Sequence, residues 1–315
     1  AFMPPLPMAV LEPLGEHSSR KQNDYLVPQC HDMCPESEIS KTIERRELWS
    51  FEREHPARPE WKTRDMAVKM FSRSAADTRI DLPELIRTPT ALLRSWVFLK
   101  EHVLDHDMEA DPRFKENGRC DYIGIESYVT DRVKMIDKDW SLQGFGGGKR
   151  LHPWAVLCLE QMVRYHIITD QELCEASSGA FNQSLNNTQL NEYLKNLLDF
   201  YDDARQRGYT CAHLSGVLRN EAEFRSYFLV LQSLNEGARI DRQTKVVRRD
   251  GSVLLVNRMM TLHPEIIKTP HMKLALQTHL CLTSGDYVGF FNIVRSGVRS
   301  LSRGDVASGG TSHDY

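Results

Sequence analysis

The sequence contains no apolar run long enough to span a membrane, and it has few features of a disulfide-rich or strongly charged protein. Its seven cysteines are an odd number scattered along the chain, which favours reduced, buried thiols in the cytosol or nucleus. The formal net charge of −3 is too small to indicate wholesale binding to nucleic acid. The N-terminus lacks a secretory signal. Because residue 1 is alanine, we expect a fragment or a processed chain.

The sequence also lacks the motifs of common enzymes. It has no Gly-x-Ser-x-Gly elbow of a hydrolase. The stretch 144–150 superficially resembles a phosphate-binding loop, but Gln143 and Arg150 stand where the pattern needs Gly and Ser or Thr. We therefore predict that the protein is not an enzyme.

Two groups of residues could be metal ligands. Cys30, His31 and Cys34 offer three ligands, but a structural zinc site needs four, and no second paired set follows. His102 and His106 are four residues apart on a predicted helix, where such side chains are more often solvated. We expect no metal and no cofactor. A metal-dependent enzyme using either group is the alternative left open.

The sequence does contain a succession of helical patterns. Helices are predicted over 35–54, 63–76, 89–106, 119–140, 152–176, 188–207, 220–236 and from 252 to about 300. Thr88-Pro89 is a helix-start signal. One helix carries an apolar stripe with i, i+3, i+4, i+7 spacing, formed by Leu190, Tyr193, Leu194, Leu197, Leu198 and Tyr201. Successive helices with short links suggest an all-α fold of stacked antiparallel helices.

A second stripe is predicted on the helix that follows, formed by Phe224, Tyr227, Phe228, Leu231 and Leu234. Asn220 is expected to be its N-cap, with Glu223 completing a capping box. Residues 1–29 are expected to be an extended or disordered leader, 30–300 the helical domain, and 301–315 a flexible tail. In 246–256, Asp250-Gly251 indicates either a β-hairpin or a loop followed by a helix.

The segment from Cys30 to Glu38 is the most informative motif. It is predicted to be a loop that enters a helix, with Pro35 at the first helical position and acidic residues against the helix dipole. Its Cys-x-Asp-Met-Cys-Pro-Glu core comprises Cys30, Asp32, Met33, Cys34, Pro35 and Glu36. Together with Phe51-Glu52, this core resembles the opening of the Sac-three/GANP family of mRNA-export scaffolds.

The resemblance continues in order along the chain. Arg73, Ser74 and Asp77 match the family's "VKxxxRSxAD" stretch, and Asp131 and Arg132 match its "DRxRxIRxD" helix, with Lys134 and Lys138 where arginine is usual. Arg164 and His166 match "RFHI", Asn220, Glu221, Phe224 and Arg225 match "NExEFRxY", and Phe290-Phe291 falls where the family has an "FxxFF" helix. Several ordered matches make chance an unsatisfactory explanation.

The resemblance implies an α-solenoid of PCI/TPR-like type and a non-enzymatic scaffold that couples transcription to the nuclear pore. It implies a PCI-domain partner, a small acidic DSS-type protein and nuclear-pore components, without a membrane partner. It further implies a location in the nucleus at the envelope and pore, with a cytoplasmic fraction allowed. The alternatives are a scaffold of a proteasome-lid or translation-initiation assembly, or a family member acting in splicing or at the centrosome.

Four basic residues form a candidate RNA contact. Lys134 and Lys138 are four residues apart and share one helix face, while Lys149 and Arg150 follow a glycine-rich loop. Such a group could hold an RNA backbone by charge without reading its sequence. The alternative is a solvated charged surface.

Overall fold

The computed structural model describes residues 25–53, 62–71, 82–145, 150–176, 179–208, 217–237 and 262–296. The chain divides into two compact units, Ala1–Ala204 and Arg205–Tyr315, and each is described by itself. Nearly all regular structure in these ranges is helical, which confirms the all-α prediction. Residues 1–24 of the leader, the segment 246–256 and the tail 301–315 lie outside the described residues, and the single domain over 30–300 stays a prediction.

The first unit contains α1 (Glu36–Glu44), α2 (Thr63–Met66), α3 (Pro89–Leu99), α4 (Tyr122–Leu142), α5 (Pro153–Leu173) and most of α6 (Gln183–Gln206). Short 3₁₀ turns lie at Ser50–Glu52, Pro83–Leu85 and Pro112–Phe114, and a π-helical turn, Lys100–Leu104, extends α3. A small hairpin joins β1 (Lys115–Glu116) to β2 (Arg119–Cys120). The second unit contains a 3₁₀ turn (Val217–Asn220), α7 (Glu221–Gly237), α9 (Pro264–Ile267), α10 (Pro270–Ser284) and a further helix over 287–296.

Several helices begin where the sequence predicts a start. Thr88 is the N-cap of α3, its hydroxyl accepts a hydrogen bond from the Ala91 N–H, and Pro89 occupies the first turn. Thr269 and Pro270 start α10 in the same way. α1 begins one residue later than predicted, because Pro35 has extended backbone and is the N-cap.

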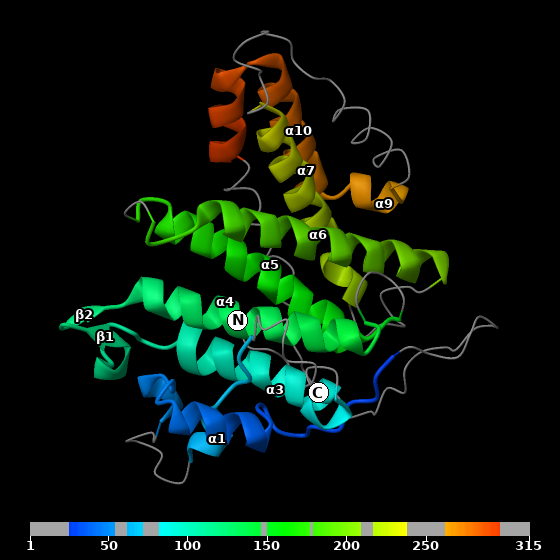
Figure 1. The fold of residues 1–315 in the computed structure, drawn as a ribbon. Helices are drawn as coiled ribbons and strands as arrows, with labels where there is room; N and C mark the ends of the chain where they lie inside the picture. Colours follow the sequence, from blue (N-terminus) through cyan, green and yellow to red (C-terminus); the bar gives the residue numbers. More distant parts are fainter. Residues whose placement is uncertain are drawn as a thin grey trace, which may run out of the picture. The chain divides into compact units, whose positions relative to one another are not determined.

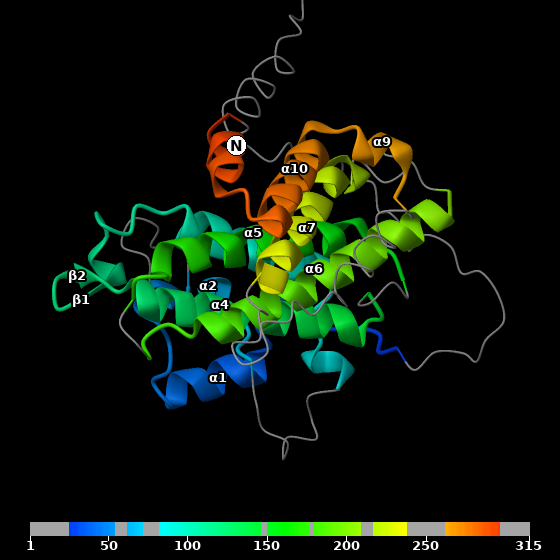
Figure 2. The ribbon, with the colours of Figure 1, turned by 90° about the horizontal axis from the view of Figure 1, so that it is seen from above.

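The helices of the first unit form an antiparallel stack, as Figures 1 and 2 show for α4, α5 and α6. Between α4 and α5, Thr130 contacts Tyr165 while the Trp140 ring lies 5.3 Å from that of His152. Between α5 and α6, the Tyr201 hydroxyl donates to Glu160 at 2.6 Å, and His166 pairs with Asn186. In both pairs the contacts advance along one helix and retreat along the other, so neighbouring helices run in opposite directions.

The predicted stripe of α6 is buried in this stack. Leu190, Tyr193, Leu194, Leu197, Leu198 and Tyr201 are all at most 3 % exposed. The helix itself begins at Gln183, five residues before the predicted start. Asn182 accepts a hydrogen bond from the Leu185 N–H, so a polar side chain supports this earlier first turn.

Three helix predictions of the first unit are wrong in extent. The predicted helix 35–54 ends at Glu44, and Arg46 adopts a left-handed conformation with φ 58°. Beyond the break, Phe51 stacks on Phe114 and meets the Tyr128 ring edge-on, so aromatic packing directs the chain. The predicted helix 63–76 ends at Met66, and the residues that follow are extended to Phe71. The start of the predicted helix 119–140 is instead the strand β2.

The second unit buries a different face of α7 from the predicted one. Its core cluster contains Ala222 and Leu229 of α7, Ile266 of α9, and Met272 and Ala275 of α10. Leu234, a member of the predicted stripe, is exposed. Asn220 ends the 3₁₀ turn directly before α7, so the predicted helix start at this position is confirmed.

Candidate functional site

Five charged side chains of the first unit gather inside it, and we call them the buried ionic network: Glu52, Lys69, Arg87, Arg132 and Asp139. All are at most 3 % exposed. They come from the 3₁₀ turn 50–52, the extended segment after α2, the residue before α3, and α4. Since an unpaired charge is very costly to bury, their pairing holds these segments together.

Asp139 of α4 is the centre of one half of the network. Its Oδ2 accepts from Arg87 Nε at 2.7 Å, and its Oδ1 lies 3.4 Å from Lys69 Nζ. Arg87 also donates to the Ser95 hydroxyl and to the Met33 carbonyl. A single carboxylate therefore joins α4 to two chain segments that precede it by 52 and 70 residues.

Glu52 is the centre of the other half. Its Oε1 accepts from the Tyr128 hydroxyl at 2.9 Å and from the Val68 N–H at 3.3 Å, and Arg132 lies 3.5 Å away. The Arg132 guanidinium also stacks 4.0 Å from the Tyr128 ring. Asp131, next along α4, accepts from the Phe71 N–H at 3.0 Å. Thus the Phe-Glu pair and the Asp-Arg pair of the sequence motifs meet in one place.

The Cys30–Glu36 segment is bound to the same region through its backbone. The Cys30 N–H donates to the Ile86 carbonyl, and the Thr88 N–H donates back to Cys30. Lys69 likewise donates its N–H to the Met33 carbonyl. Asp32 and Glu36, on the outside, both pair with Arg64.

Cys30 and Cys34 are packing residues in this arrangement. Both are buried, and Cys34 contacts a small cluster with Ile39 and Ala67. Burial raises the pKa of both thiols above the usual value, which disfavours the thiolate form that metals and electrophiles require. Within the described ranges, no group of three or more His, Cys, Asp or Glu side chains is placed to hold a metal ion.

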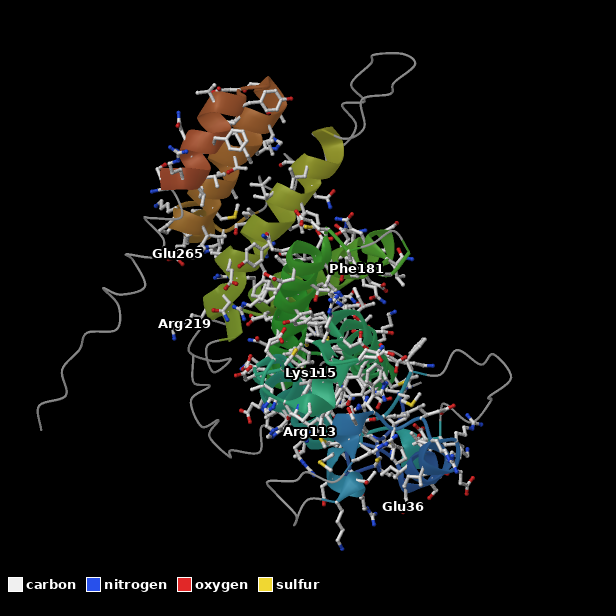
Figure 3. The ribbon with its side chains drawn as sticks, turned by 90° about the vertical axis from the view of Figure 1, so that its left-hand side faces the viewer. Glu36, Arg113, Lys115, Phe181, Arg219 and Glu265 are labelled. Carbon is white, nitrogen blue, oxygen red and sulfur yellow. The ribbon has the colours of Figure 1, made fainter. Side chains whose placement is uncertain are left out.

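The histidine pair at the end of α3 is involved in local contacts. His106 Nε2 lies 2.9 Å from Asp111, and its ring stacks on Phe114. Burial alone would raise the pKa of Asp111, but hydrogen bonds from Arg113, labelled in Figure 3, and from His106 hold that pKa below its usual range. His102 lies in the π-helical turn, with its ring 5.3 Å from that of Phe98.

His166 links α5 to α6. Its Nδ1 lies 2.6 Å from the Asn186 side-chain oxygen, and Asn186 donates in return to the His166 carbonyl. The oxygen can only accept, so Nδ1 carries the proton and Nε2 is unprotonated, buried and without a hydrogen-bond partner. Burial lowers the pKa of His166 to about 4. Arg164, from the same motif, is only half-buried.

In the second unit, Glu221 is the residue that organises the start of α7. It is buried and accepts from Arg205 at 2.7 Å and from Arg225 at 2.8 Å. Phe224 is fully buried beside it on the same helix. The matched residues of this motif thus fix the geometry of a helix start.

The predicted RNA contact is only partly visible. Lys134 and Lys138 are half-buried on one face of α4, and Lys138 lies 5.9 Å from the Phe71 ring. Arg150 donates to the Gln143 carbonyl and stacks on Phe145, so it helps to close the loop after α4. Lys149, like Arg73, Ser74 and Asp77, lies outside the described residues.

Arg87 is the main structural residue that the sequence reasoning missed. It is fully buried and contacts Asp139, Ser95 and Met33. The available signal was a lone cation in the apolar stretch Leu85-Ile86-Arg87, directly before a helix start. A buried arginine needs a carboxylate partner, and Asp139 was the one on the neighbouring motif helix.

These features define an all-helical protein whose sequence motifs build a buried ionic frame rather than a catalytic centre. A family model described as the SAC3/GANP family matches residues 33–302, and the chain belongs to this family, as the motifs predicted. No helix in the described ranges is both long enough and apolar enough to cross a membrane.

Three curated proteins are similar to the chain over most of its length. "SAC3 family protein B" of Arabidopsis thaliana is 29% identical over 90% of the chain, and "SAC3 family protein 1" of Schizosaccharomyces pombe is 29% identical over 86%. "Protein xmas" of Drosophila melanogaster is 27% identical over 84%. The matched regions cover only 15%, 24% and 11% of these relatives, respectively.

Proposed function

We propose that the chain is a non-enzymatic scaffold in a nuclear mRNA-export complex that couples transcription to the nuclear pore. The observation that carries the proposal is the family match over residues 33–302. It is also the reason to prefer this role to a proteasome-lid or translation-initiation assembly. The proposed partners are a PCI-domain protein, a small acidic DSS-type protein and nuclear-pore components, at the nuclear envelope.

The buried position of the motif residues supports a scaffold role. Glu52, Arg132 and Glu221 are saturated with internal partners, so they maintain the fold instead of reacting with a substrate. In a protein of this kind, function resides on exposed helix faces that bind other macromolecules.

Affinity purification tests this role. The tagged 315-residue chain is incubated with nuclear extract, and bound proteins are identified by mass spectrometry, with a tagged unrelated helical protein as control. We expect a PCI-domain protein and a small acidic protein among the specific partners. Recovery of proteasome-lid, initiation, splicing or centrosomal subunits in their place would overturn the export role.

RNA contact through Lys134, Lys138, Lys149 and Arg150 is a second part of the proposal. What supports it is the half-exposed position of Lys134 and Lys138 on one face of α4. Binding through phosphates alone would be weak, independent of sequence and steeply sensitive to salt.

A low-salt filter assay with unstructured RNA tests this contact. Replacing all four residues with Glu should abolish retention while leaving the helical circular-dichroism signal unchanged. Because Arg150 closes a loop, a variant with Arg150 intact and the three lysines replaced is measured in parallel. The matched charge control replaces four other surface cations with Glu: Lys41, Arg45, Lys62 and Lys195. Absence of salt-sensitive retention by the unmodified chain, or equal loss in the control, would contradict the contact.

A further inference from the structure

The helix over residues 287–296 turns large apolar side chains toward solvent. Tyr287, Val288 and Phe291 are 69%, 73% and 66% exposed, and Val294 is 39% exposed. Tyr287, Phe291 and Val294 have i, i+4, i+7 spacing, with Val288 three residues before Phe291, so all four share one face. Leu280, near the end of α10, is 63% exposed. We call these five residues the C-terminal apolar face.

This helix is held in place although its outer face is uncovered by described residues. Gly285 ends α10 in a left-handed conformation with φ 75°, and the Asp286 N–H donates to the Cys281 carbonyl. The Asp286 carboxylate then accepts from the Gly289 N–H at 2.8 Å and caps the new helix. Figure 1 shows the resulting helix, in orange-red, beside α10. The exposed side chains are therefore presented on an ordered element.

The charges around the face have one sign. α10 and the 287–296 helix contain Lys273 and Arg295, both exposed, and neither helix contains an acidic residue. The only carboxylate between them is Asp286, which is engaged as the cap. In the sequence, Arg299 and Arg303 follow directly. This region is cationic in a chain whose formal net charge is −3.

We infer that the C-terminal apolar face binds an amphipathic helix of a partner protein, with acidic residues flanking the apolar stripe of that helix. Exposed apolar patches of this kind mark interaction sites, and an i, i+4, i+7 face matches the apolar side of another helix. The acidic flanks complement Lys273 and Arg295 and select the partner by charge. Because the inference rests on this surface alone, it stands independently of the export role.

A membrane surface fits these features less well than a helix. The exposed apolar stripe belongs to a helix of ten residues, from 287 to 296, and only Arg295 on it is basic. Stable attachment to a bilayer needs a larger apolar face or a second anchor. A partner helix of similar length can cover the face completely.

Fluorescence anisotropy with designed peptides tests the inference on the full 315-residue chain. The probe is a labelled amphipathic peptide of about three heptads, with Leu at the a and d positions and Glu at the flanking positions. A matched peptide has Lys in place of Glu. We expect the acidic peptide to bind about tenfold or more tightly than the basic one.

Substitutions on the face identify the site. Val288→Glu combined with Phe291→Glu should weaken acidic-peptide binding about tenfold or more, since buried aromatic anchors dominate such interfaces. Arg295→Glu should weaken the acidic peptide and favour the basic one. Ile168→Glu, at a 59% exposed position of α5, is the matched control and should change nothing. All four positions are exposed, so the unfolding midpoint should be preserved and loss of binding is attributable to the face.

Three outcomes would overturn the inference. One is no binding of the acidic peptide, and another is equal binding of both peptides. The third is binding to phosphatidylserine vesicles without peptide binding, which would show that the face is a membrane contact.

Discussion

At the scale of single residues, the family motifs are mostly interior polar groups. Glu52, Arg132 and Glu221 are each buried with a partner of opposite charge. Such pairs contribute little net stability compared with apolar residues, but breaking one leaves a charge without compensation. They therefore specify which segments pack together.

Asp139→Ala tests this account of the buried ionic network. The substitution leaves Arg87 and Lys69 buried without their carboxylate, so unfolding free energy should fall by about 3–5 kcal/mol. Chemical denaturation measures the change. Asp32→Ala, which removes one exposed partner of Arg64, is the control and should cost less than about 1 kcal/mol. Similar small losses in both variants would show that the network does not constrain the fold.

His166 should make stability depend on pH. Its folded-state pKa is lowered by burial to about 4 from an ordinary 6.5, so the unfolded chain binds the proton more tightly. Stability from the neutral ring is complete above pH ~6.5 and is lost as pH falls toward ~4. Between pH 7 and pH 5 the expected loss is about 2 kcal/mol.

Comparison with His166→Gln isolates this contribution. The variant should be less stable at pH 7, because the pairing with Asn186 is altered, yet it should lose about 2 kcal/mol less on acidification to pH 5. Denaturant unfolding at the two pH values gives the difference. Parallel pH dependence in the two proteins would contradict a buried neutral His166.

At the scale of secondary-structure elements, periodicity succeeds where one face dominates. The six-residue stripe of α6 is buried as its spacing predicts. On α7 apolar residues occur nearly all round, so spacing alone does not select the face that meets α9 and α10. The core cluster instead uses Ala222 and Leu229, which leaves Leu234 exposed.

The β1–β2 hairpin is an element that local sequence could have revealed. Asn117 and Gly118 between its strands have φ values of 50° and 81°. Two successive positive φ angles characterise a primed hairpin turn, for which Asn-Gly is the strongest short signal. The neighbouring helical pattern hid it, because the helix predicted from residue 119 absorbed the second strand.

Leu197→Ala tests the packing of α6. The side chain is fully buried, so its truncation should cost about 2–5 kcal/mol of unfolding free energy through lost burial and a residual cavity. Leu185→Ala on the same helix removes an exposed side chain and should change stability by about 0.5 kcal/mol or less. Thermal or denaturant unfolding of both variants provides the comparison. Equal effects would mean that the stripe of α6 is not interior.

At the scale of the whole molecule, the fold does not use a metal at the sites described. Cys30 and Cys34 are buried thiols with raised pKa values, and they pack the N-terminal segment. Incubation with a chelator should therefore leave the unfolding midpoint unchanged, whereas Cys30→Ser with Cys34→Ser should lower it modestly. A zinc-finger protein treated in parallel is the positive control. Unfolding caused by chelation, or stoichiometric metal in elemental analysis, would refute this reading.

The sequence by itself determined the helical class, the starts of α3 and α10, the buried face of α6 and the family. These features depend on neighbouring residues, through spacing, Thr-Pro caps and ordered motifs. Only the tertiary structure decided that Arg87 pairs with Asp139, that the predicted helix 35–54 breaks at Arg46, and which face of α7 is buried. Each of these outcomes is set by partners far along the chain, and distant contacts override local propensity because they carry most of the burial.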